Sequence, residues 1–234
     1  MLILSYPVYC NDWRNKRIFQ KSLRTIHFDG ELLLHLVING CKYPDFISSL
    51  SDRPNTQLVM SPVNSVAGAW ARAIQRLHDF GDDAVLLMAN QDIFFHRKTL
   101  NILYSAAQQD GFVFGDSGKV MNAFSLWGGR LKTFVRFFEK DPDVRCKGLP
   151  DELFAPAYFE DNDLLRRMDL SGSKRIAVQA KYRHVGSSVI KYDKNLRKQN
   201  KVSHERNKEY YIKKWGGEPG RETFDTPFGN LREN

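Results

Sequence analysis

AVLLMANQD, at residues 84–92, joins six consecutive apolar residues to the polar residues Asn90, Gln91 and Asp92. An uninterrupted apolar run of this length predicts a strand that is buried on both faces, as in a parallel sheet covered by helices. Ligands of such sheets bind at the carboxyl ends of the strands. We therefore expect the three polar residues to lie at a ligand site.

The sequence on the N-terminal side of this strand alternates strand and helix patterns. Apolar runs predict strands over 2–9, 31–38 and 56–60. Helices are predicted from an N-cap at Asp12 to about residue 26, and over 65–79, because apolar residues recur there at helical spacing. The alternation predicts an α/β fold with a mixed, mostly parallel sheet flanked by helices. Further ligand-binding residues are expected just after the other strands.

The C-terminal half has weaker patterns. Turn residues predominate over 108–118, and a strand that ends in a Gly128-Gly129 turn is predicted within 122–129. Helices are predicted over 131–140 and 160–168, and a last strand over 175–182. Since no boundary between two domains is apparent, we predict one domain over 1–217 and a polar C-terminal tail over 218–234.

The cysteines and the hydropathy indicate the compartment. Cys10, Cys41 and Cys146 are odd in number and far apart in the sequence. They argue against a disulfide framework and fit the reducing cytoplasm. No apolar run reaches the roughly 20 residues that a membrane helix needs. We expect a soluble cytoplasmic protein, and no feature of the sequence indicates an obligate protein partner.

Positive charge is concentrated near the C-terminus. The net charge of the chain is +8, and residues 191–215 contain nine Lys or Arg residues against three acids. Such a segment attracts phosphates, so a nucleotide, a nucleic acid and peripheral attachment to an anionic membrane surface all remain open. A solvated basic helix without any partner explains the pattern equally well.

Two acidic motifs could carry chemistry. Asp92 could bind a hard divalent cation that neutralises a diphosphate, or it could cap the turn that follows it. The stretch YFEDNDL, at residues 158–164, places three carboxylates in four residues at the start of a predicted helix. These acids suit the helix dipole, but one of them could also take a proton from an attacking hydroxyl. Asp161 is our first choice for this general base and Glu160 is the second.

Two further stretches could contact a ligand. His184 opens the loop HVGSS, at residues 184–188, where the imidazole could complete a metal shell or touch a diphosphate and the Ser hydroxyls could donate to phosphate oxygens. The expected turn at Trp127, Gly128 and Gly129 could lie near a ligand, because glycine lets the backbone approach a ligand closely. An ordinary polar loop and a plain hairpin turn are the alternatives.

Taken together, the motifs resemble the inverting GT-A glycosyltransferases of the large family 2 type, particularly its rhamnosyltransferase-like members. NQD at 90–92 is similar to the DXD-like segment of that family, YFEDNDL to its FFEDVDL pattern, and HVGSS to its HxGxS loop. NSVAGAWARA at 64–73 is similar to its Asn/Gly/Ala-rich helix start, and YYIKKWGG at 210–217 to its RYYIRKWGG tail. The resemblance extends over about residues 2–217, with the motifs in the same order.

The resemblance implies a single GT-A domain that transfers a sugar, with inversion, from a nucleoside-diphosphate sugar to an acceptor hydroxyl. The nucleotide is expected to be UDP, the enzyme a hexosyltransferase, and the acceptor a glycan or another hydroxyl compound that can itself be anionic. Mn²⁺ or Mg²⁺ would be held by Asp92 and His184, and Asp161 or Glu160 would be the base. The expected donor-binding residues are Pro7, Tyr9, Asn39, Asn64, Asn90, Gln91 and Ser187. The expected residues near the acceptor or sugar are Trp127, Gly128 and Asp163.

The chain departs from the family pattern at two places. Ile38 stands where the family has a base-contacting Asp, and Asp92 is the single acid of the DXD-like segment. The nucleotide base and the dependence on metal therefore stay open. A nucleotidyltransferase of similar fold is one alternative, although the absence of glycine between Tyr6 and Arg14 counts against it. The other alternative is a basic nucleic-acid-binding module, although no known binding motif is present.

Overall fold

The computed structural model describes residues 1–61, 64–116 and 124–230. Within these residues a mixed sheet has seven strands in the order β3-β2-β1-β4-β7-β6-β8, and β5 pairs with β9 in a second, two-stranded sheet. Strands β3, β2, β1 and β4 are parallel, whereas β7 runs antiparallel to both β4 and β6. The strands are β1 Leu2–Cys10, β2 Leu32–Cys41, β3 Thr56–Met60, β4 Val85–Ala89, β5 Ile93–Phe95, β6 Phe112–Asp116, β7 Leu126–Arg130, β8 Arg175–Gln179 and β9 Tyr182–His184.

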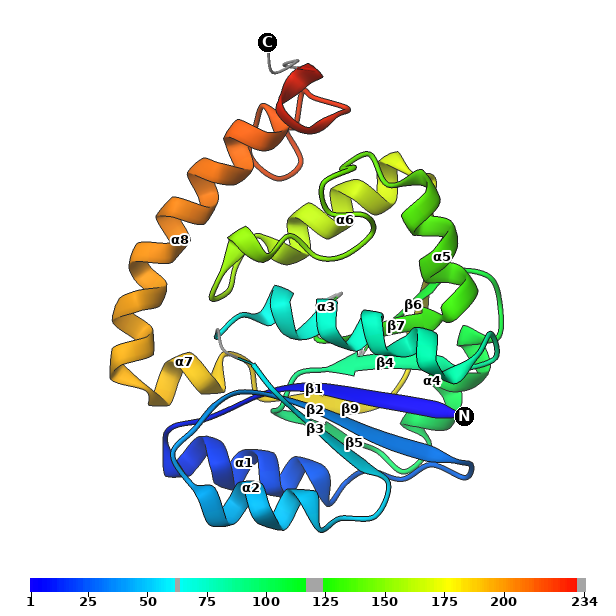
Figure 1. Cartoon of the computed structure of the whole chain (residues 1–234), viewed down its shortest axis with the longest axis vertical. Coiled ribbons are helices and arrows are strands. Elements are labelled where there is room, and N and C mark those ends of the chain that lie inside the picture. The colour runs from blue at the N-terminus through cyan, green and yellow to red at the C-terminus, as the bar shows by residue number, and fades with distance from the viewer. Residues whose placement is uncertain (62–63, 117–123, 231–234) are drawn as a thin grey trace.

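Helices cover both faces of the large sheet (Figure 1). The helices are α1 Trp13–Leu23, α2 Pro44–Ser51, α3 Val66–Leu77, α4 Thr99–Ala107, α5 Leu131–Lys140, α6 Glu160–Leu170, α7 Ser188–Tyr192 and α8 Lys194–Trp215. One apolar core joins α1, α2 and α4 to the sheet, and a second joins α3, α5 and α6 to its opposite face. Alternate residues of β1 divide between the two cores: Leu2 and Leu4 belong to the first and Ile3 to the second. The chain thus has the predicted α/β fold.

All four strands predicted for the first half are present, each within three residues of its predicted bounds. Both predicted helices are present, the first with the expected cap at Asp12, whereas α2 and α4 were not predicted. Asp12 Oδ1 accepts a hydrogen bond from the Arg14 backbone N at 2.8 Å, and Ser65 Oγ accepts one from the Gly68 N at 3.0 Å. These side chains satisfy backbone N–H groups that have no partner inside the helix.

Four predictions for the backbone were wrong. Residues 112–116 form β6 inside the segment that was expected to be turns, and the strand expected over 175–182 is divided between β8 and β9. The strand predicted over 31–38 continues through Asn39 and Gly40 as part of β2, opposite a register shift between Val8 and Tyr9 of β1. Gly128 and Gly129 likewise belong to β7, in the middle of the sheet. Each difference arises from strand pairing between segments that are far apart in the sequence. Local sequence patterns contain no information on such pairing.

Gly128 is required by the close approach of two strands. An ideal Cβ at this position would lie 1.8 Å from the Leu86 carbonyl oxygen of β4. We therefore expect Gly128→Ala to force β4 and β7 apart and to lower the free energy of unfolding by about 3 kcal/mol, the scale of an overpacked core. Chemical denaturation measures this loss. Gly172→Ala is the control, because no atom lies within 4 Å of its Cβ position, although its positive φ of 67° carries a smaller cost of its own. Equal losses in the two variants would contradict the packing argument.

The long helix α8 is attached to the domain by a buried cluster of charges near its C-terminal end. Lys214 Nζ lies 2.8 Å from Asp143 Oδ2, 2.8 Å from Asp151 Oδ2 and 2.6 Å from Asp163 Oδ1. Trp215 Nε1 also donates to Asp163 Oδ1 at 2.8 Å. This cluster fixes α8 to α6, and it thereby sets where the first half of α8 lies. Among the described helices, none has the length and apolar character needed to cross a bilayer.

Candidate active site

A cleft of about 250 Å³ lies at the carboxyl ends of β1, β2 and β4. Its other walls come from the loop before α6, from α7 and from the first half of α8. All eleven residues predicted for catalysis, metal binding or donor binding line this cleft. They are Pro7, Tyr9, Asn39, Asn64, Asn90, Gln91, Asp92, Glu160, Asp161, His184 and Ser187. The fold thus brings together residues that are up to 180 positions apart in the sequence (187 − 7 = 180).

Gln91 shapes the edge of the cleft. Its side chain is 3 % exposed and pairs with the backbone of Tyr9. The Tyr9 N donates to Gln91 Oε1 at 2.7 Å, and Gln91 Nε2 donates to the Tyr9 carbonyl at 3.1 Å. This is the place where the register between β1 and β2 shifts. Gln91 therefore continues the pairing of β1 on the side of β4, beyond the last paired residues Ser5 and Met88, and its neighbours Asn90 and Asp92 line the cleft.

Asp92 and His184 form a pair in the floor of the cleft. Antiparallel pairing of β5 with β9 brings Ile93 opposite His184, and the Val185 N donates to the Asp92 carbonyl at 3.2 Å. Asp92 Oδ1 and His184 Nε2 are 3.0 Å apart. Burial raises the pKa of Asp92, but the hydrogen bond and charge of His184 and the hydrogen bond from the Ser188 backbone N outweigh burial and lower it. Asp92 is therefore an ionised carboxylate although it is only 4 % exposed.

The Asp92–His184 pair fits a divalent cation. A carboxylate oxygen and an imidazole nitrogen are both metal ligands. Two neighbouring ligands of an octahedral ion, each bonded at about 2.1 Å, lie about 3.0 Å apart, which is the separation of these two atoms. The Asn90 Nδ2 is a further 3.4 Å from His184 Nε2, so polar groups surround the pair.

The acidic pair Glu160 and Asp161 stands at the N-terminus of α6. The two residues before it, Tyr158 and Phe159, have positive φ angles of 76° and 70°. Non-glycine residues adopt this conformation at a cost, and it is common at functional sites. Asn207 of α8 holds the turn, because its Nδ2 donates to the Ala157 and Tyr158 carbonyls at 3.0 and 3.1 Å. Helix α8 therefore determines where the two carboxylates lie.

Both carboxyl groups of this pair have raised pKa values. Burial raises the pKa of Glu160 well above its usual range, and the neighbouring charge of Asp161 raises it further. Burial also raises the pKa of Asp161, against the opposing hydrogen bond from the Asn162 N. Glu160 Oε2 is buried with no hydrogen-bond partner among the described residues. Such environments bring a carboxylate closer to the basicity that proton transfer near neutral pH requires.

Sequence reasoning pointed to the Ser hydroxyls of the 184–188 loop but missed the rest of the wall that α7 and α8 contribute. Ser188, Val189, Ile190, Leu196 and Asn200 line the cleft. Ser188 Oγ and Asn200 Oδ1 are buried there without a partner among the described residues, as is Asn39 Oδ1 on the opposite side. The available signal was the spacing of Leu196, Asn200, Ser203 and Asn207, which is that of one helix face and is buried throughout.

Three predicted residues lie away from the cleft. Trp127 is fully buried, with its ring centroid 5.3 Å from that of Trp70, and Gly128 is enclosed between two strands. Asp163 is fully buried in the charge cluster with Lys214 and Arg167. None of the three can touch a substrate from these positions, because the core covers them. We leave them out of the function proposed below.

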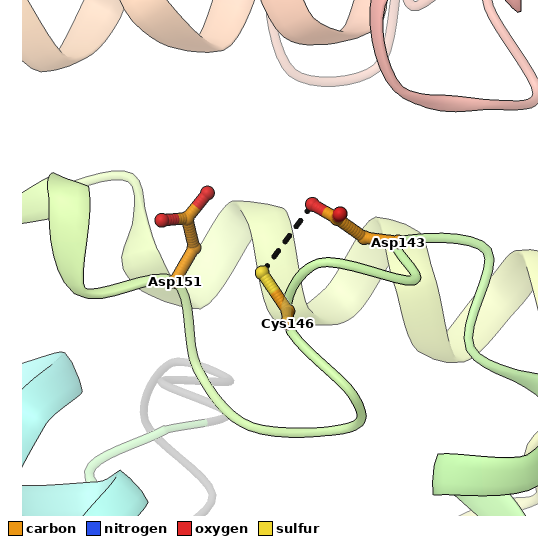
Figure 2. A group of neighbouring side chains, drawn as sticks. All are labelled: Asp143, Cys146 and Asp151. Atoms are coloured by element: carbon orange, nitrogen blue, oxygen red, sulfur yellow. Dashed lines mark hydrogen bonds between the residues drawn. The ribbon is translucent and has the colours of Figure 1, made fainter.

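A second group of metal-type ligands lies outside the cleft. Figure 2 shows Asp143, Cys146 and Asp151 pointing toward one another, with their ligand atoms within 4.8 Å. The ammonium of Lys214 is already 2.8 Å from both carboxylates. Burial raises the pKa of the Cys146 thiol, which donates to Asp143 Oδ2 at 3.3 Å. A cation and a protonated thiol thus occupy the group, and its role is structural.

Comparison with solved structures identifies the fold. A nucleotide-diphospho-sugar transferase from Desulfovibrio desulfuricans matches with a TM-score of 0.51 and 11 % identity, over 88 % of this chain and 97 % of its own. The mannosyltransferase PcManGT from Pyrobaculum calidifontis, solved with GDP-Man and Mn²⁺, matches with a TM-score of 0.55 and 15 % identity, over 87 % and 62 %. This chain therefore has the GT-A fold of nucleotide-diphospho-sugar transferases.

The same fold also occurs in an enzyme with different chemistry. The 2-C-methyl-D-erythritol 4-phosphate cytidylyltransferase of Francisella tularensis matches with a TM-score of 0.50 and 10 % identity, over 85 % of this chain and 98 % of its own. No protein-family model matches the chain, and no curated protein matches its sequence. The neighbours thus include glycosyltransferases and a nucleotidyltransferase, and the choice between these activities depends on the site.

Proposed function

We propose that this protein is an inverting glycosyltransferase that uses a nucleoside-diphosphate sugar. The observation that supports the proposal most is the convergence of eleven residues, named from sequence motifs, on one cleft. The cleft combines an ionised carboxylate paired with an imidazole and a second pair of carboxyl groups with raised pKa values. Sugar transfer needs these two functions separately, one at the departing diphosphate and one at the acceptor hydroxyl.

The donor is proposed to lie along the strand ends. Pro7, Tyr9, Asn39 and Asn64 would surround the nucleoside, and UDP is the nucleotide we propose. Asn39 Nδ2 donates to the Ser65 carbonyl at 3.0 Å, which leaves Asn39 Oδ1 buried and free to accept from the imide N–H of a uracil ring. Asn39 would thereby compensate for Ile38, whose side chain is buried in the core.

The diphosphate is proposed to lie over Asp92 and His184. These residues would hold Mn²⁺ or Mg²⁺, and the bound ion would offset the negative charge that builds up on the leaving diphosphate. Ser187 and Ser188 lie beside Asp92, and the unpartnered Ser188 Oγ could donate to a phosphate oxygen. Ser187 and Ser188 would orient the diphosphate whether or not the ion is bound.

Asp161 is proposed as the general base. It takes the proton of the acceptor hydroxyl while the hydroxyl oxygen attacks the anomeric carbon on the face opposite the diphosphate. The new C–O bond forms as the bond from the anomeric carbon to the phosphate oxygen breaks, so the configuration inverts. Glu160, whose pKa burial raises well above its usual range, would donate a hydrogen bond in its protonated form. The acceptor is proposed to be a glycan or another hydroxyl compound.

Nucleotidyl transfer is the second candidate, favoured by the structural similarity to the cytidylyltransferase. The two reactions give different products. A glycosyltransferase releases a nucleoside diphosphate from a nucleotide sugar. A nucleotidyltransferase transfers the nucleotidyl group of a nucleoside triphosphate to a sugar phosphate and releases pyrophosphate. Assays for each product under matched conditions separate the candidates, and pyrophosphate release alone would replace our proposal.

Donor binding should depend on metal through Asp92. We expect UDP, among UDP, GDP, CDP and dTDP, to raise the melting temperature when Mn²⁺ is present. Ligand at a hundredfold excess over its dissociation constant adds about 2.7 kcal/mol, or roughly 5–10 °C for a domain of this size. Asp92→Asn should lose the metal-dependent part of the shift.

Asp82→Asn is the control for the Asp92 variant, because Asp82 is an exposed aspartate outside the cleft. It should keep the full shift. If Asp92→Asn shows the same metal-dependent shift as the wild type, Asp92 does not hold the metal. A larger shift with another nucleotide would instead change the base that we assign.

A further inference from the structure

Two helices of the protein carry basic stripes on their outward faces. On α8 the stripe consists of Lys194, Arg197, Lys198 and Lys201, at the spacing i, i+3, i+4 and i+7 that places residues on one helix face. On α1 and its C-cap it consists of Arg14, Arg17, Lys21 and Arg24, at i, i+3, i+7 and i+10. All eight side chains are exposed, and α1 contains no acidic residue.

The two stripes meet at α7, which lies beside the N-terminal end of α1 and leads into α8 (Figure 1). Asn15 Nδ2 of α1 donates to the Val189 carbonyl of α7 at 3.3 Å. The guanidinium of Arg14 lies 5.5 Å from the ring centroid of Tyr192, and Lys191 Nζ lies 5.7 Å from it. Segments about 175 residues apart in the sequence thus form one surface, which we call the basic surface.

The charge of the basic surface is not neutralised within the protein. None of the eight stripe cations, nor Lys191, has a salt bridge to any carboxylate in the described residues. The two acids within it cap helices: Asp12 Oδ1 accepts from the Arg14 N, and Asp193 Oδ1 accepts from the Asn195 and Leu196 N. The surface therefore presents an excess of positive charge to an external partner.

An exposed aromatic residue lies within the basic surface. Trp13 is 53 % exposed, whereas the other tryptophans, Trp70, Trp127 and Trp215, are buried. The Arg14 guanidinium lies 5.4 Å from the Trp13 ring centroid. Indole rings are enriched at the interface between water and bilayer, where the ring contacts the acyl region and its N–H stays with the polar groups. Lys and Arg residues around such a ring are attracted by anionic headgroups.

We propose that the basic surface docks the protein on a bilayer that contains anionic phospholipids. One exposed indole is enough to anchor a protein at the headgroup level of a bilayer, whereas single-stranded nucleic acids are bound by several rings that stack on successive bases. Tyr192, the other ring here, is already covered by Arg14 and Lys191. Because α7 also lines the cleft with Ser188, Val189 and Ile190, docking would bring the cleft close to the lipid surface.

The docking proposal does not depend on the transfer reaction, so its test measures binding alone. The full chain is sedimented with vesicles of phosphatidylcholine and with vesicles of phosphatidylcholine and phosphatidylglycerol in equal parts. We expect binding to the anionic vesicles only, weakened by salt. Each Lys or Arg near such a surface raises the partition coefficient onto anionic vesicles about fivefold. The triple variant Lys194→Gln, Lys198→Gln and Lys201→Gln should therefore lower this coefficient by about 100-fold. The triple variant Arg17→Gln, Lys21→Gln and Arg24→Gln should lower it by as much.

The matched control neutralises three exposed cations outside the basic surface, as Arg97→Gln with Lys98→Gln and Lys181→Gln. It should bind like the wild type. The blue shift of tryptophan emission on binding should disappear in Trp13→Phe. The proposal would be overturned if the protein bound neutral vesicles as well as anionic ones, or if the control variant lost as much binding as the two triple variants. Tighter binding to a DNA duplex or a single-stranded RNA than to anionic vesicles, at the same salt concentration, would also overturn it.

Discussion

Replacing Asp161 with asparagine should lower the turnover number for sugar transfer by about 10³-fold and leave the affinity for the donor nucleotide within about twofold. An asparagine keeps the shape of the side chain but cannot accept the proton of the acceptor hydroxyl, and general base catalysis is worth about 10²–10⁴-fold. The donor affinity should persist because the proposed donor residues lie at the strand ends. Nucleoside diphosphate release measures turnover, and the melting shift measures donor binding.

Two further variants test whether the effect belongs to Asp161 itself. Asp169→Asn, near the other end of α6, removes a carboxylate that pairs with Arg175 at the surface and should leave turnover unchanged. Glu160→Gln should have a smaller effect than Asp161→Asn, because a protonated Glu160 and a glutamine can both donate a hydrogen bond. If Glu160→Gln is inactive and Asp161→Asn is not, the base is Glu160.

The pH profile of transfer gives an independent readout of the same base. The pKa of Asp161 is raised by burial, so its carboxylate is protonated over a wider acidic range than that of an ordinary aspartate. Turnover should rise with pH through this raised pKa and then level off, since only the ionised form accepts a proton. The residual activity of Asp161→Asn should lack this limb. An unchanged limb in the variant would assign the titration to another group.

Local sequence patterns were sufficient to predict the half of the fold that binds the nucleotide in our proposal. Strands β1, β2 and β4 are covered by helices on both faces, so each appears as a continuous apolar run with polar residues at its end. The carboxyl ends of parallel strands share one edge of the sheet. Polar residues that follow several such strands must then lie close together, as Tyr9, Asn39 and Gln91 do.

The same reasoning failed where the structure depends on distant pairing. Gly128 and Gly129 have the local character of a turn, yet they lie in β7, because only glycine allows β4 to approach so closely at position 128. The spacing of Leu196, Asn200 and Ser203 places Asn200 on the buried face of α8, but it does not indicate what that face packs against. Its position follows from the contacts of Lys214 and Trp215, about four helical turns further along α8.

Asp163 shows how a carboxylate can match a motif and yet lie outside the cleft. The EDND run at 160–163 contains three acids, and local sequence cannot rank them. The helix places Asp161 at the cleft and turns Asp163 toward Arg167 and Lys214. Side chains two residues apart on a helix point in directions that differ by about 200°, so Asp161 and Asp163 face different surroundings. The resemblance to known motifs therefore indicated the EDND run. Only the tertiary contacts show that Asp161 faces the cleft and that Asp163 does not.

The loss of Lys214 should be the most destabilising single change in the chain. Three aspartates lie within 2.8 Å of its ammonium, and all of these groups are buried. Lys214→Met preserves much of the side-chain volume but leaves the carboxylates without their shared cation. Removing one partner of a buried ion pair costs about 3–5 kcal/mol, a large part of the roughly 5–15 kcal/mol of a whole domain. Urea denaturation at neutral pH measures the cost.

The pH dependence of this loss distinguishes uncompensated charge from simple loss of packing. Burial raises the pKa of Asp143 and of Asp151, but hydrogen bonds and charges, including those of Lys214, outweigh it and lower both values. Carboxylates with lowered pKa values stabilise the fold above their unfolded pKa of about 3.9, and this contribution is lost as pH falls. In Lys214→Met the same carboxylates should protonate more readily. The difference in stability between wild type and variant should therefore shrink on acidification.

The control for this variant is Lys208→Met, on the exposed side of α8, where Nζ pairs with Glu218 at 2.7 Å. An exposed pair contributes little, so this variant should unfold with the wild type at every pH. A constant difference between Lys214→Met and wild type across pH would mean that packing, not charge, holds α8 in place. If the charges do hold it, Lys214→Met should also weaken donor binding and transfer together under conditions where most of the chain is folded. The cluster fixes α8, and α8 carries both Asn200 in the cleft wall and Asn207, whose amide holds the turn before Glu160 and Asp161.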